Sequence, residues 1–461
     1  MSSDRPSPDI AAPLPSGLIA TVRHWFAEGT FRRVFKNAGL LLSGRATNGI
    51  LGLAMLSLAA RGLGLEQFGV FVLMITYIQV IMALATFQSW QAVIRYGAIC
   101  MESKNIPAFQ ALIKFTALLD IAGVMIGAAI GWFGAPLVGP TVGWDPAMVE
   151  NAQWFSLQLL FLVLATPTGL LRLFDRFDLL AGQAVVTPLV RFIGVGIAVA
   201  VGAPFWAYLV TWFVASVLGG AALIFIGWRE AARRGLLTGM TFSLEGITAP
   251  HGGIWKFSIF SNLHSSLQIV TAQASTFLVG MLAGPAAAGL FKIGRDVATA
   301  ISKPAELLNQ SIYPEFARIG SRGDWRDFKA LIRRGAAVAA SSGAAMLVLS
   351  LVAGQLFITT FFGHDFDAAF VPLVLMVATA GLTLCGFPME PALYAMGRPS
   401  IPLRIETFVV CVVYLPTLIL LTKSMGPTGA AIASLATAAT SLLGMSYFTV
   451  TQLRRRINAS A

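Results

Sequence analysis

The chain has 461 residues, of which 56% are hydrophobic and 11% are charged, and its formal net charge is +11. Soluble globular domains carry about 25% charged residues, so a surface facing water on all sides is excluded and a bilayer is the solvent that fits. The cysteines Cys100, Cys385 and Cys411 have no CxxC spacing and lie in or beside apolar runs. This placement is typical of small buried side chains rather than of disulfides or metal ligands.

Residues 1–37 form the first predicted element, a cytoplasmic N-terminal segment. Its first 15 residues are polar and Pro-rich, which indicates disorder rather than a signal peptide. Residues 21–37 mix aromatic and basic side chains, as in a helix lying on an anionic membrane surface. An ordinary charged lead-in to the first membrane helix explains this composition equally well.

Twelve apolar runs long enough to cross a bilayer follow, and they predict an all-α polytopic membrane protein of about twelve transmembrane helices. The runs are residues 38–60, 68–92, 111–134, 151–171, 183–202, 205–227, 257–282, 288–312, 335–355, 371–387, 404–422 and 428–450. Four domains are predicted from them: an N-terminal six-helix bundle (38–227), a cytoplasmic linker (228–256), a C-terminal six-helix bundle (257–450) and a cytoplasmic tail (451–461).

The basic residues are unevenly divided between the two sides of the predicted membrane protein. With the N-terminus in the cytoplasm, 26 of the 32 Lys and Arg residues fall on the cytoplasmic side. This excess predicts a multi-pass protein of the cell inner membrane with both termini cytoplasmic. The excess of Lys and Arg on the cytoplasmic side accounts for the positive net charge of the chain, so nucleic acid is not expected as a partner.

A short internal repeat relates the two predicted bundles. GLEQFGVF at residues 64–71 and GPAAAGLF at residues 284–291 are offset by 220 residues and lie in the first outer hairpin of each bundle. Two six-helix units in the same orientation imply a pseudo-two-fold axis along the membrane normal, an arrangement typical of transporters with a substrate path between the halves. The match is short, so chance similarity stays open as the alternative.

The eighth predicted membrane helix carries a polar stripe. Spacings of three and four residues place its polar side chains on one face, which predicts a face lining water or protein rather than lipid. Local neutralisation of lysines by nearby acids is the alternative explanation. The residues are Lys292, Arg295, Asp296, Thr299, Lys303, Glu306 and Gln310. Among them, Lys292, Arg295 and Lys303 are candidate substrate-binding cations, and Asp296 and Glu306 are candidate ion-coupling carboxylates.

Polar residues elsewhere in the predicted membrane helices complete the candidate site. Arg45 and Asn48 in the first helix and His264 and Gln268 in the seventh are candidate substrate-binding residues of a central cavity. Arg45 could instead snorkel to the membrane interface, and His264 could make a helix-packing hydrogen bond. Asp120, the lone carboxylate of the third helix, is a candidate proton or cation site, or the partner of a buried arginine.

Signatures of enzymes are missing from the sequence. It contains no GxxxxGK[ST], HExxH or GxSxG motif, which disfavours nucleotide-driven pumping, metalloprotease chemistry and serine hydrolysis. We therefore expect no enzyme activity, no cofactor and no resident metal.

Several short motifs resemble those of a known family. LAARGLGLEQFGVF at residues 58–71 is similar to the opening hairpin of the polysaccharide exporters, the Wzx-like oligosaccharide flippases of the multidrug/oligosaccharidyl-lipid/polysaccharide (MOP) superfamily. AGLFK at 288–292, YPEFAR at 313–318 and AMGRP at 395–399 extend the resemblance over most of the chain. The resemblance implies two six-helix bundles around a central cavity.

The same resemblance implies movement of an undecaprenyl-diphosphate-linked oligosaccharide from the cytoplasmic to the periplasmic leaflet. The product would be O-antigen, capsule or secreted exopolysaccharide, with a proton or sodium ion as coupling partner and a polysaccharide polymerase as possible protein partner. A multidrug or cation antiporter of the same superfamily is the first alternative, but its cationic cargo would favour an acidic cavity. A membrane-bound polysaccharide polymerase or ligase is the second, but it needs catalytic groups in a sizeable outer loop.

Overall fold

The computed structural model describes residues 29–241, 243–244, 246–310, 319, 325–396, 398 and 400–460, without the side chains of residues 29–48, 260–272, 304–310, 395 and 459–460. Over these ranges the elements are helices, with no β-strand, so the predicted all-α class is confirmed. The predicted helix on the membrane surface, residues 21–37, lies partly outside the described residues.

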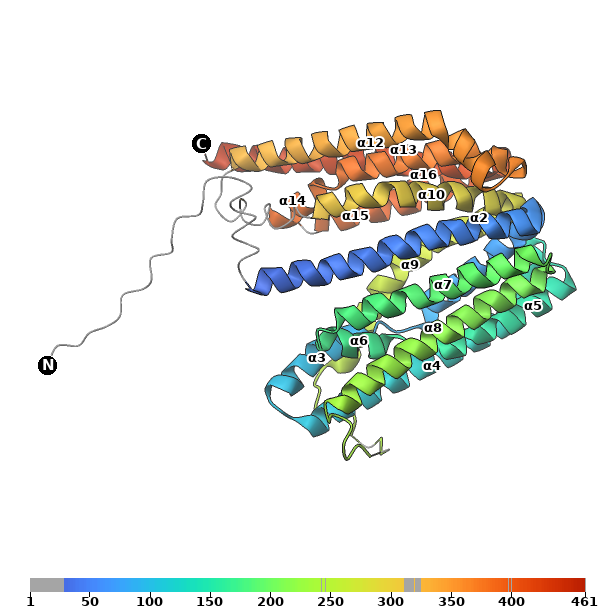
Figure 1. Ribbon diagram of the computed structural model, residues 1–461. Helices are drawn as coiled ribbons and strands as arrows, with labels where there is room; N and C mark the ends of the chain where they lie inside the picture. Colours follow the sequence, from blue (N-terminus) through green and yellow to red (C-terminus); the bar gives the residue numbers. More distant parts are fainter. Residues whose placement is uncertain are drawn as a thin grey trace.

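The first half of the chain forms seven α-helices and the second half forms seven more in the described ranges (Figure 1). The first seven are α2 (Gly29–Ala85), α3 (Trp90–Glu102), α4 (Ile106–Val138), α5 (Pro146–Ser156), α6 (Ala165–Leu173), α7 (Phe177–Ala200) and α8 (Phe205–Arg233). The others are α9 (Ile254–Ala283), α10 (Pro285–Gln310), α12 (Trp325–Phe361), α13 (Phe370–Gly386), α14 (Met389–Ala395), α15 (Ser400–Phe408) and α16 (Leu415–Ser460). Short 3-10 or π segments connect several of them: η1 (Gly139–Val142), η2 (Leu157–Phe161), η3 (His364–Ala369) and η4 (Val409–Tyr414).

Glycines with left-handed backbone angles divide the two longest helices. Gly64 has φ 71° inside α2, and Gly426 has φ 58° inside α16, so each helix contains two rods that meet at a sharp turn. Eight described segments are long and apolar enough to cross a bilayer, and two of them, 49–102 and 400–458, each hold two such rods. With the 30-residue α9 and the 26-residue α10, the described part of the chain contains twelve rods, in agreement with the predicted number.

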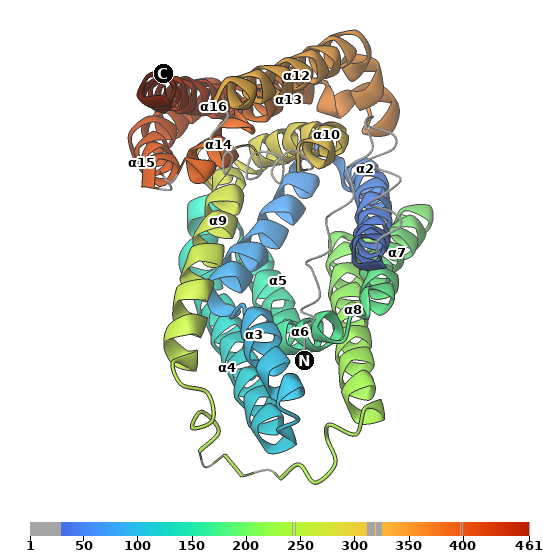
Figure 2. The same ribbon diagram turned by 90° about the vertical axis from the view of Figure 1, so that its left-hand side faces the viewer.

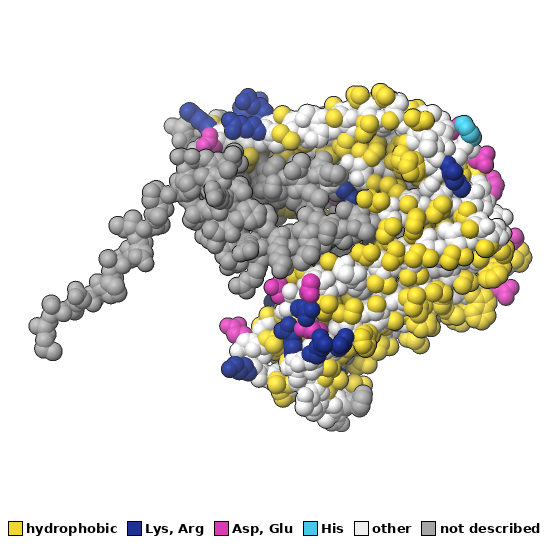
Figure 3. Space-filling model, in the orientation of Figure 1, with side chains coloured by type: hydrophobic (Ala, Val, Ile, Leu, Met, Phe, Trp, Pro, Cys, Tyr) yellow, Lys and Arg dark blue, Asp and Glu magenta, His cyan; other side chains and the backbone are white. Residues whose placement is uncertain are grey.

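The outer surface of the helices is apolar. Val352, Leu137 and Phe133 are 79%, 77% and 73% exposed, and Figure 3 shows hydrophobic side chains covering the middle of the face in view. On that face, Lys and Arg gather mainly toward the end of the molecule at which α2 begins and α16 ends. An apolar belt between charged ends is the surface that a bilayer selects, so the chain is a multi-pass membrane protein.

The two repeated hairpins turn at glycines with similar backbone angles and touch each other. Gly64 (φ 71°, ψ 172°) and Gly284 (φ 87°, ψ 171°) occupy equivalent positions of the repeat. A Cβ atom at Gly69 would overlap the Pro285 carbonyl, and a Cβ at Gly289 would press on the Phe68 ring. The repeat therefore marks the place where the halves meet at one end of the molecule, which we call the hairpin end.

At the opposite end, where α2 begins and α16 ends, the ribbons of the two halves diverge (Figures 1 and 2). Helices α12, α13 and α16 lie on one side, α4, α5 and α8 lie on the other, and α2, α9 and α10 lie between them. One buried core joins the halves, with Phe71 of α2, Ile293 of α10 and Leu373 of α13 among its members. This core lies beside the central cavity described next.

Candidate functional site

A cavity of about 580 Å³ lies between the two halves of the chain. Helices α2, α7 and α8 of the first half and α9 and α10 of the second half supply its walls. Its polar lining residues are Gln79, Arg191, Gln273, Lys292, Asp296, Thr299 and Lys303. We call this space the central cavity.

The polar stripe of α10 forms one wall of the central cavity. Lys292, Asp296, Thr299 and Lys303 line it, while Ile293 on the other face of the same helix is fully buried in the core. The stripe arises because spacings of three and four residues repeat with the helical period of 3.6. Local neutralisation, the alternative explanation of the stripe, also occurs here, because the Lys292 ammonium pairs with the Asp296 carboxylate one turn later.

The remaining cations of α10 reach neighbouring helices. Lys303 extends to α2, where its Nζ lies 3.7 Å from the point that a Cβ atom on Gly49 would occupy. Arg295 is absent from the cavity lining, and its Nη2 donates a hydrogen bond of 3.2 Å to Oε1 of Gln273. Gln273 itself lines the cavity, so Arg295 contacts the site through this amide.

Arg191 of α7 is a cavity residue that sequence reasoning missed. It lies near the middle of α7 and lines the central cavity. Its guanidinium stacks on the Trp212 ring of α8 at 3.6 Å, and its Nη2 donates to Oγ of Ser216 at 3.2 Å. Its buried Nε has no hydrogen-bond partner among the described groups. The available signal was its position, nine residues into the predicted helix 183–202.

Five predicted site residues lie outside the described side chains: Arg45, Asn48, His264, Gln268 and Glu306. The backbone places the first two in α2, the next two in α9 and the last in α10, and these three helices all border the central cavity. Their assignment as site residues stays a prediction.

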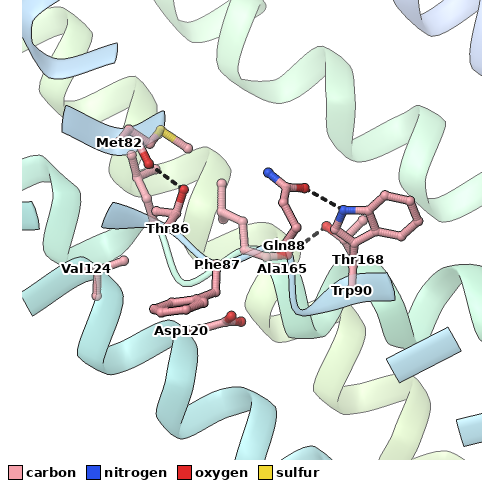
Figure 4. A pocket seen from close by; sticks show the side chains of 11 residues that line it. Met82, Thr86, Phe87, Gln88, Trp90, Asp120, Val124, Ala165 and Thr168 are labelled. Carbon is pink, nitrogen blue, oxygen red and sulfur yellow. Dashed lines mark hydrogen bonds between the residues drawn. The ribbon is translucent and has the colours of Figure 1, made fainter. Parts of the chain in front are cut away.

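Asp120 of α4 does not line the central cavity but a separate pocket of about 170 Å³ (Figure 4). The side chain is 4% exposed, and its carboxyl accepts hydrogen bonds from the Ser89 hydroxyl and, at 2.7 Å, from the Thr166 backbone N–H. Among the described residues Asp120 forms no ion pair, so the alternative of a buried arginine partner finds no support there.

The charge of the central cavity is positive. Among the described lining residues, Arg191, Lys292 and Lys303 are cations and Asp296 is the single carboxylate. Arg presents planar donors that fit phosphate oxygens, and its stacking on Trp212 holds the plane in one orientation. Such an arrangement can bind an anionic group and keep it hydrated inside the membrane. In the described residues no group of three or more metal-ligating side chains occurs.

Comparisons with known proteins agree with this architecture. The family described as "Polysaccharide biosynthesis protein" matches residues 34–320. The Escherichia coli (strain K12) "Inner membrane protein YghQ" is 31% identical over 349 residues, which are 76% of this chain and 98% of that protein.

Solved structures share the fold at low sequence identity. An inward-facing multidrug resistance MATE family transporter of the MOP superfamily superposes with a TM-score of 0.69 at 13% identity, covering 90% of this chain and 96% of that one. The lipid II flippase MurJ in an inward closed conformation gives a TM-score of 0.62 at 13% identity, covering 90% and 89%. The predicted fold and the predicted family, rather than an enzyme class, are confirmed. The chain belongs to the polysaccharide biosynthesis protein family and has the fold of the MOP-superfamily transporters.

Proposed function

We propose that this protein is a flippase that moves an undecaprenyl-diphosphate-linked oligosaccharide from the cytoplasmic to the periplasmic leaflet. The observation that carries this proposal is the central cavity, where three described cations meet one carboxylate. A diphosphate cannot cross hydrocarbon bare, because transferring its charge out of water without compensation is too costly. The Arg191 guanidinium and the Lys292 and Lys303 ammonium groups offer that compensation between the two halves.

A neighbouring apolar pocket supports a lipid-linked cargo. It has a volume of about 380 Å³, lies between α2, α10, α12 and α13, and shares Leu53 and Ala300 with the central cavity. Leu349 on its wall is 57% exposed on the surface that faces lipid. The isoprenoid tail can occupy this pocket while the diphosphate stays among the cations, so each part of the cargo meets a matching environment.

The surrounding assignments belong to the same proposal. The protein resides in the inner membrane with both termini cytoplasmic, as the Lys and Arg distribution predicts. Residues 38–227 and 257–450 act as two bundles that rock against each other around the cavity. Arg45, Asn48, His264 and Gln268 complete the substrate contacts, and Arg295 holds the Gln273 amide at the cavity wall. Asp296 and Glu306 take part in ion coupling, and a polysaccharide polymerase receives the exported oligosaccharide.

The test compares two lipids with the same tail, undecaprenyl diphosphate and the uncharged undecaprenol. Their binding to the purified full chain is measured by native mass spectrometry. Arg191→Gln should weaken undecaprenyl diphosphate binding at least tenfold, because hydrogen bonds to charged groups contribute about 1.5–3 kcal/mol each, and it should leave undecaprenol binding unchanged. Arg191→Lys should retain part of the affinity.

Arg229→Gln serves as the matched control, since Arg229 is an exposed arginine of α8 that does not line the cavity. Equal affinity of wild type and Arg191→Gln for undecaprenyl diphosphate would refute the cationic-cavity mechanism. If the cavity instead binds organic cations, the multidrug antiporter becomes the better assignment.

A further inference from the structure

Two of the membrane-crossing segments are interrupted, and α4 passes both interruptions. The second crossing breaks between the end of α2 at Ala85 and the start of α3 at Trp90. The fourth breaks between η2, which ends at Phe161, and α6, which begins at Ala165. Asp120 is the fifteenth of the 33 residues of α4, so it lies near the middle of the membrane. Discontinuous helices at this depth are a recurring way to build ion sites in transporters.

Asp120 links the two interruptions. Its Oδ1 accepts from the hydroxyl of Ser89, the residue before α3, and its Oδ2 accepts from the N–H of Thr166 in the first turn of α6. The carboxyl group thereby satisfies a backbone donor that the break in the fourth crossing leaves without an intrahelical partner. A change in the charge of Asp120 changes both contacts at once.

No cation balances an ionised Asp120 in the described structure. The other residues that line its pocket are uncharged. On the elements packed against α4, Arg172 of α6 stacks over the Trp90 ring at 4.2 Å, Arg95 of α3 stacks over Phe257 at 4.8 Å, and Glu150 of α5 is exposed. An unpaired carboxylate at this depth is costly, and taking up a proton relieves that cost.

An acceptor for such a proton is already present. The Thr166 hydroxyl lies beside the Asp120 carboxyl, is fully buried, and makes no hydrogen bond to any other described group. A hydroxyl oxygen accepts as well as donates, so it can pair with a protonated carboxyl group. The site therefore offers partners to both charge states: two donors to the carboxylate, and one acceptor to the acid.

One further pocket shares lining residues with both the Asp120 pocket and the central cavity. This pocket has a volume of about 220 Å³ and shares Met82, Leu162 and Leu164 with the Asp120 pocket. It shares Gln79, Arg191 and Trp212 with the central cavity. Leu162 and Leu164 belong to the break in the fourth crossing, so a rearrangement of this break reaches the wall beside Arg191.

We propose that Asp120, Ser89 and Thr166 form a proton-binding site, separate from the central cavity, whose protonation is coupled to anion binding at Arg191. Protonation weakens the hydrogen bonds that the Asp120 carboxyl accepts from Ser89 and Thr166, so the two breaks can rearrange. In the ionised state these bonds keep both breaks packed against α4. The site does not depend on which anionic cargo the cavity carries.

Infrared difference spectroscopy on the purified full chain in lipid nanodiscs tests the site. Wild type should show a C=O stretching band of a protonated carboxylic acid that disappears as pH rises. Asp120→Asn should lose this band. The matched control Asp145→Asn, which alters an exposed carboxylate capping α5 through the Met148 N–H at 2.7 Å, should keep it.

Thr166→Val keeps the shape and the backbone N–H and removes the acceptor, so it should shift the band to higher frequency. A band that is identical in wild type and Asp120→Asn overturns the site. A band that is absent at every pH, together with a sodium-dependent carboxylate signal, also overturns it, because Asp120 then binds a metal cation and not a proton.

The coupling is tested with inorganic pyrophosphate as the probe. Saturating pyrophosphate should change the amplitude of the Asp120 band in wild type, and Arg191→Gln should abolish this change. An unchanged band with bound pyrophosphate overturns the coupling. A cavity that does not bind pyrophosphate counts against the proposed function instead, and the pH titration of the band then decides the proton site by itself.

Discussion

At the scale of single residues, the two faces of α10 differ in what surrounds them. Thr299 is exposed and lines the central cavity, whereas Val297 is 3% exposed and packs in the core shared by the two halves. Two positions of one helix, only two residues apart, therefore lie in opposite environments. This contrast allows the water access of the cavity wall to be tested without removing any charge.

We expect Thr299→Cys to react with a membrane-impermeant thiol reagent and Val297→Cys to remain unlabelled. Both variants are made in a background in which Cys100, Cys385 and Cys411 are replaced, and labelling is measured by gel shift or mass spectrometry. The physical reason is that the reagent follows water, which reaches the cavity but not the packed face. Equal labelling at the two positions would contradict the assignment of the cavity wall.

At the scale of elements, the two hairpins meet through glycines rather than side chains. Gly69 of α2 faces the backbone of Pro285 and Ala286, and an added Cβ would overlap the Pro285 carbonyl. Because backbone cannot rotate away as a side chain can, the two hairpins must separate to accept even one methyl group. Gly289 is more tolerant, since its nearest neighbour is the Phe68 ring.

Gly69→Ala should therefore destabilise the protein by about 1–3 kcal/mol, the usual cost of overpacking, and lower its Tm in detergent. Gly289→Ala should have a smaller effect. Gly196→Ala in α7 is the matched control, because nothing lies within 4 Å of its added Cβ and alanine favours a helix. Thermal unfolding followed by tryptophan fluorescence ranks the three variants, and a Gly69→Ala protein as stable as Gly196→Ala would rule out the close hairpin contact.

At the scale of the whole molecule, hydrogen bonds from α2 to the end of α12 join the two halves at the hairpin end, and we call this set of bonds the clasp. Arg61 of α2 donates from Nε to the Phe361 carbonyl at 2.8 Å and from Nη2 to the Thr360 carbonyl, and the Ser57 hydroxyl also donates to Phe361. These carbonyls belong to the last residues of α12 and lack intrahelical partners. The Arg61 side chain of the first half therefore caps a helix of the second half. A conformation that opens this end must break the clasp.

Arg61→Gln should favour opening at the hairpin end. Spin labels at the exposed positions Glu66 and His364 report the separation of the halves, and their mean distance should increase in Arg61→Gln. Lys423→Gln, which removes an exposed cation in α16 near Gly426, should leave the distance unchanged. An identical distance distribution in wild type and Arg61→Gln would show that the clasp does not hold the halves together.

The orientation of the whole molecule in the membrane is a separate prediction. The Lys and Arg distribution predicts that reporter fusions at residues 140 and 365 are periplasmic and that fusions at 240, 325 and 458 are cytoplasmic. Phosphatase and fluorescent-protein fusions at these positions measure this directly. Reversed sidedness at any two of them would overturn the predicted topology.

The sequence alone determined the all-α membrane class and the polar face of α10. These features depend on local hydrophobicity and on the helical period, which neighbouring residues set by themselves. The repeat at residues 64–71 and 284–291 was also readable, because the same turn needs glycine in both halves.

Only the tertiary structure decided which polar groups meet. Arg191 is not among the candidates that the sequence suggests, and only the packing of α7 against α8 places it beside Trp212 in the lining of the cavity that Lys292 also lines. For Asp120 the sequence left open a proton or cation site and a buried arginine partner, and the breaks beside Ser89 and Thr166 supply its hydrogen bonds. Partners that lie 31 and 46 residues away along the chain are chosen by the packing of helices and by where those helices break. Local periodicity carries no information on either, which is why the site needed the fold while the fold class did not.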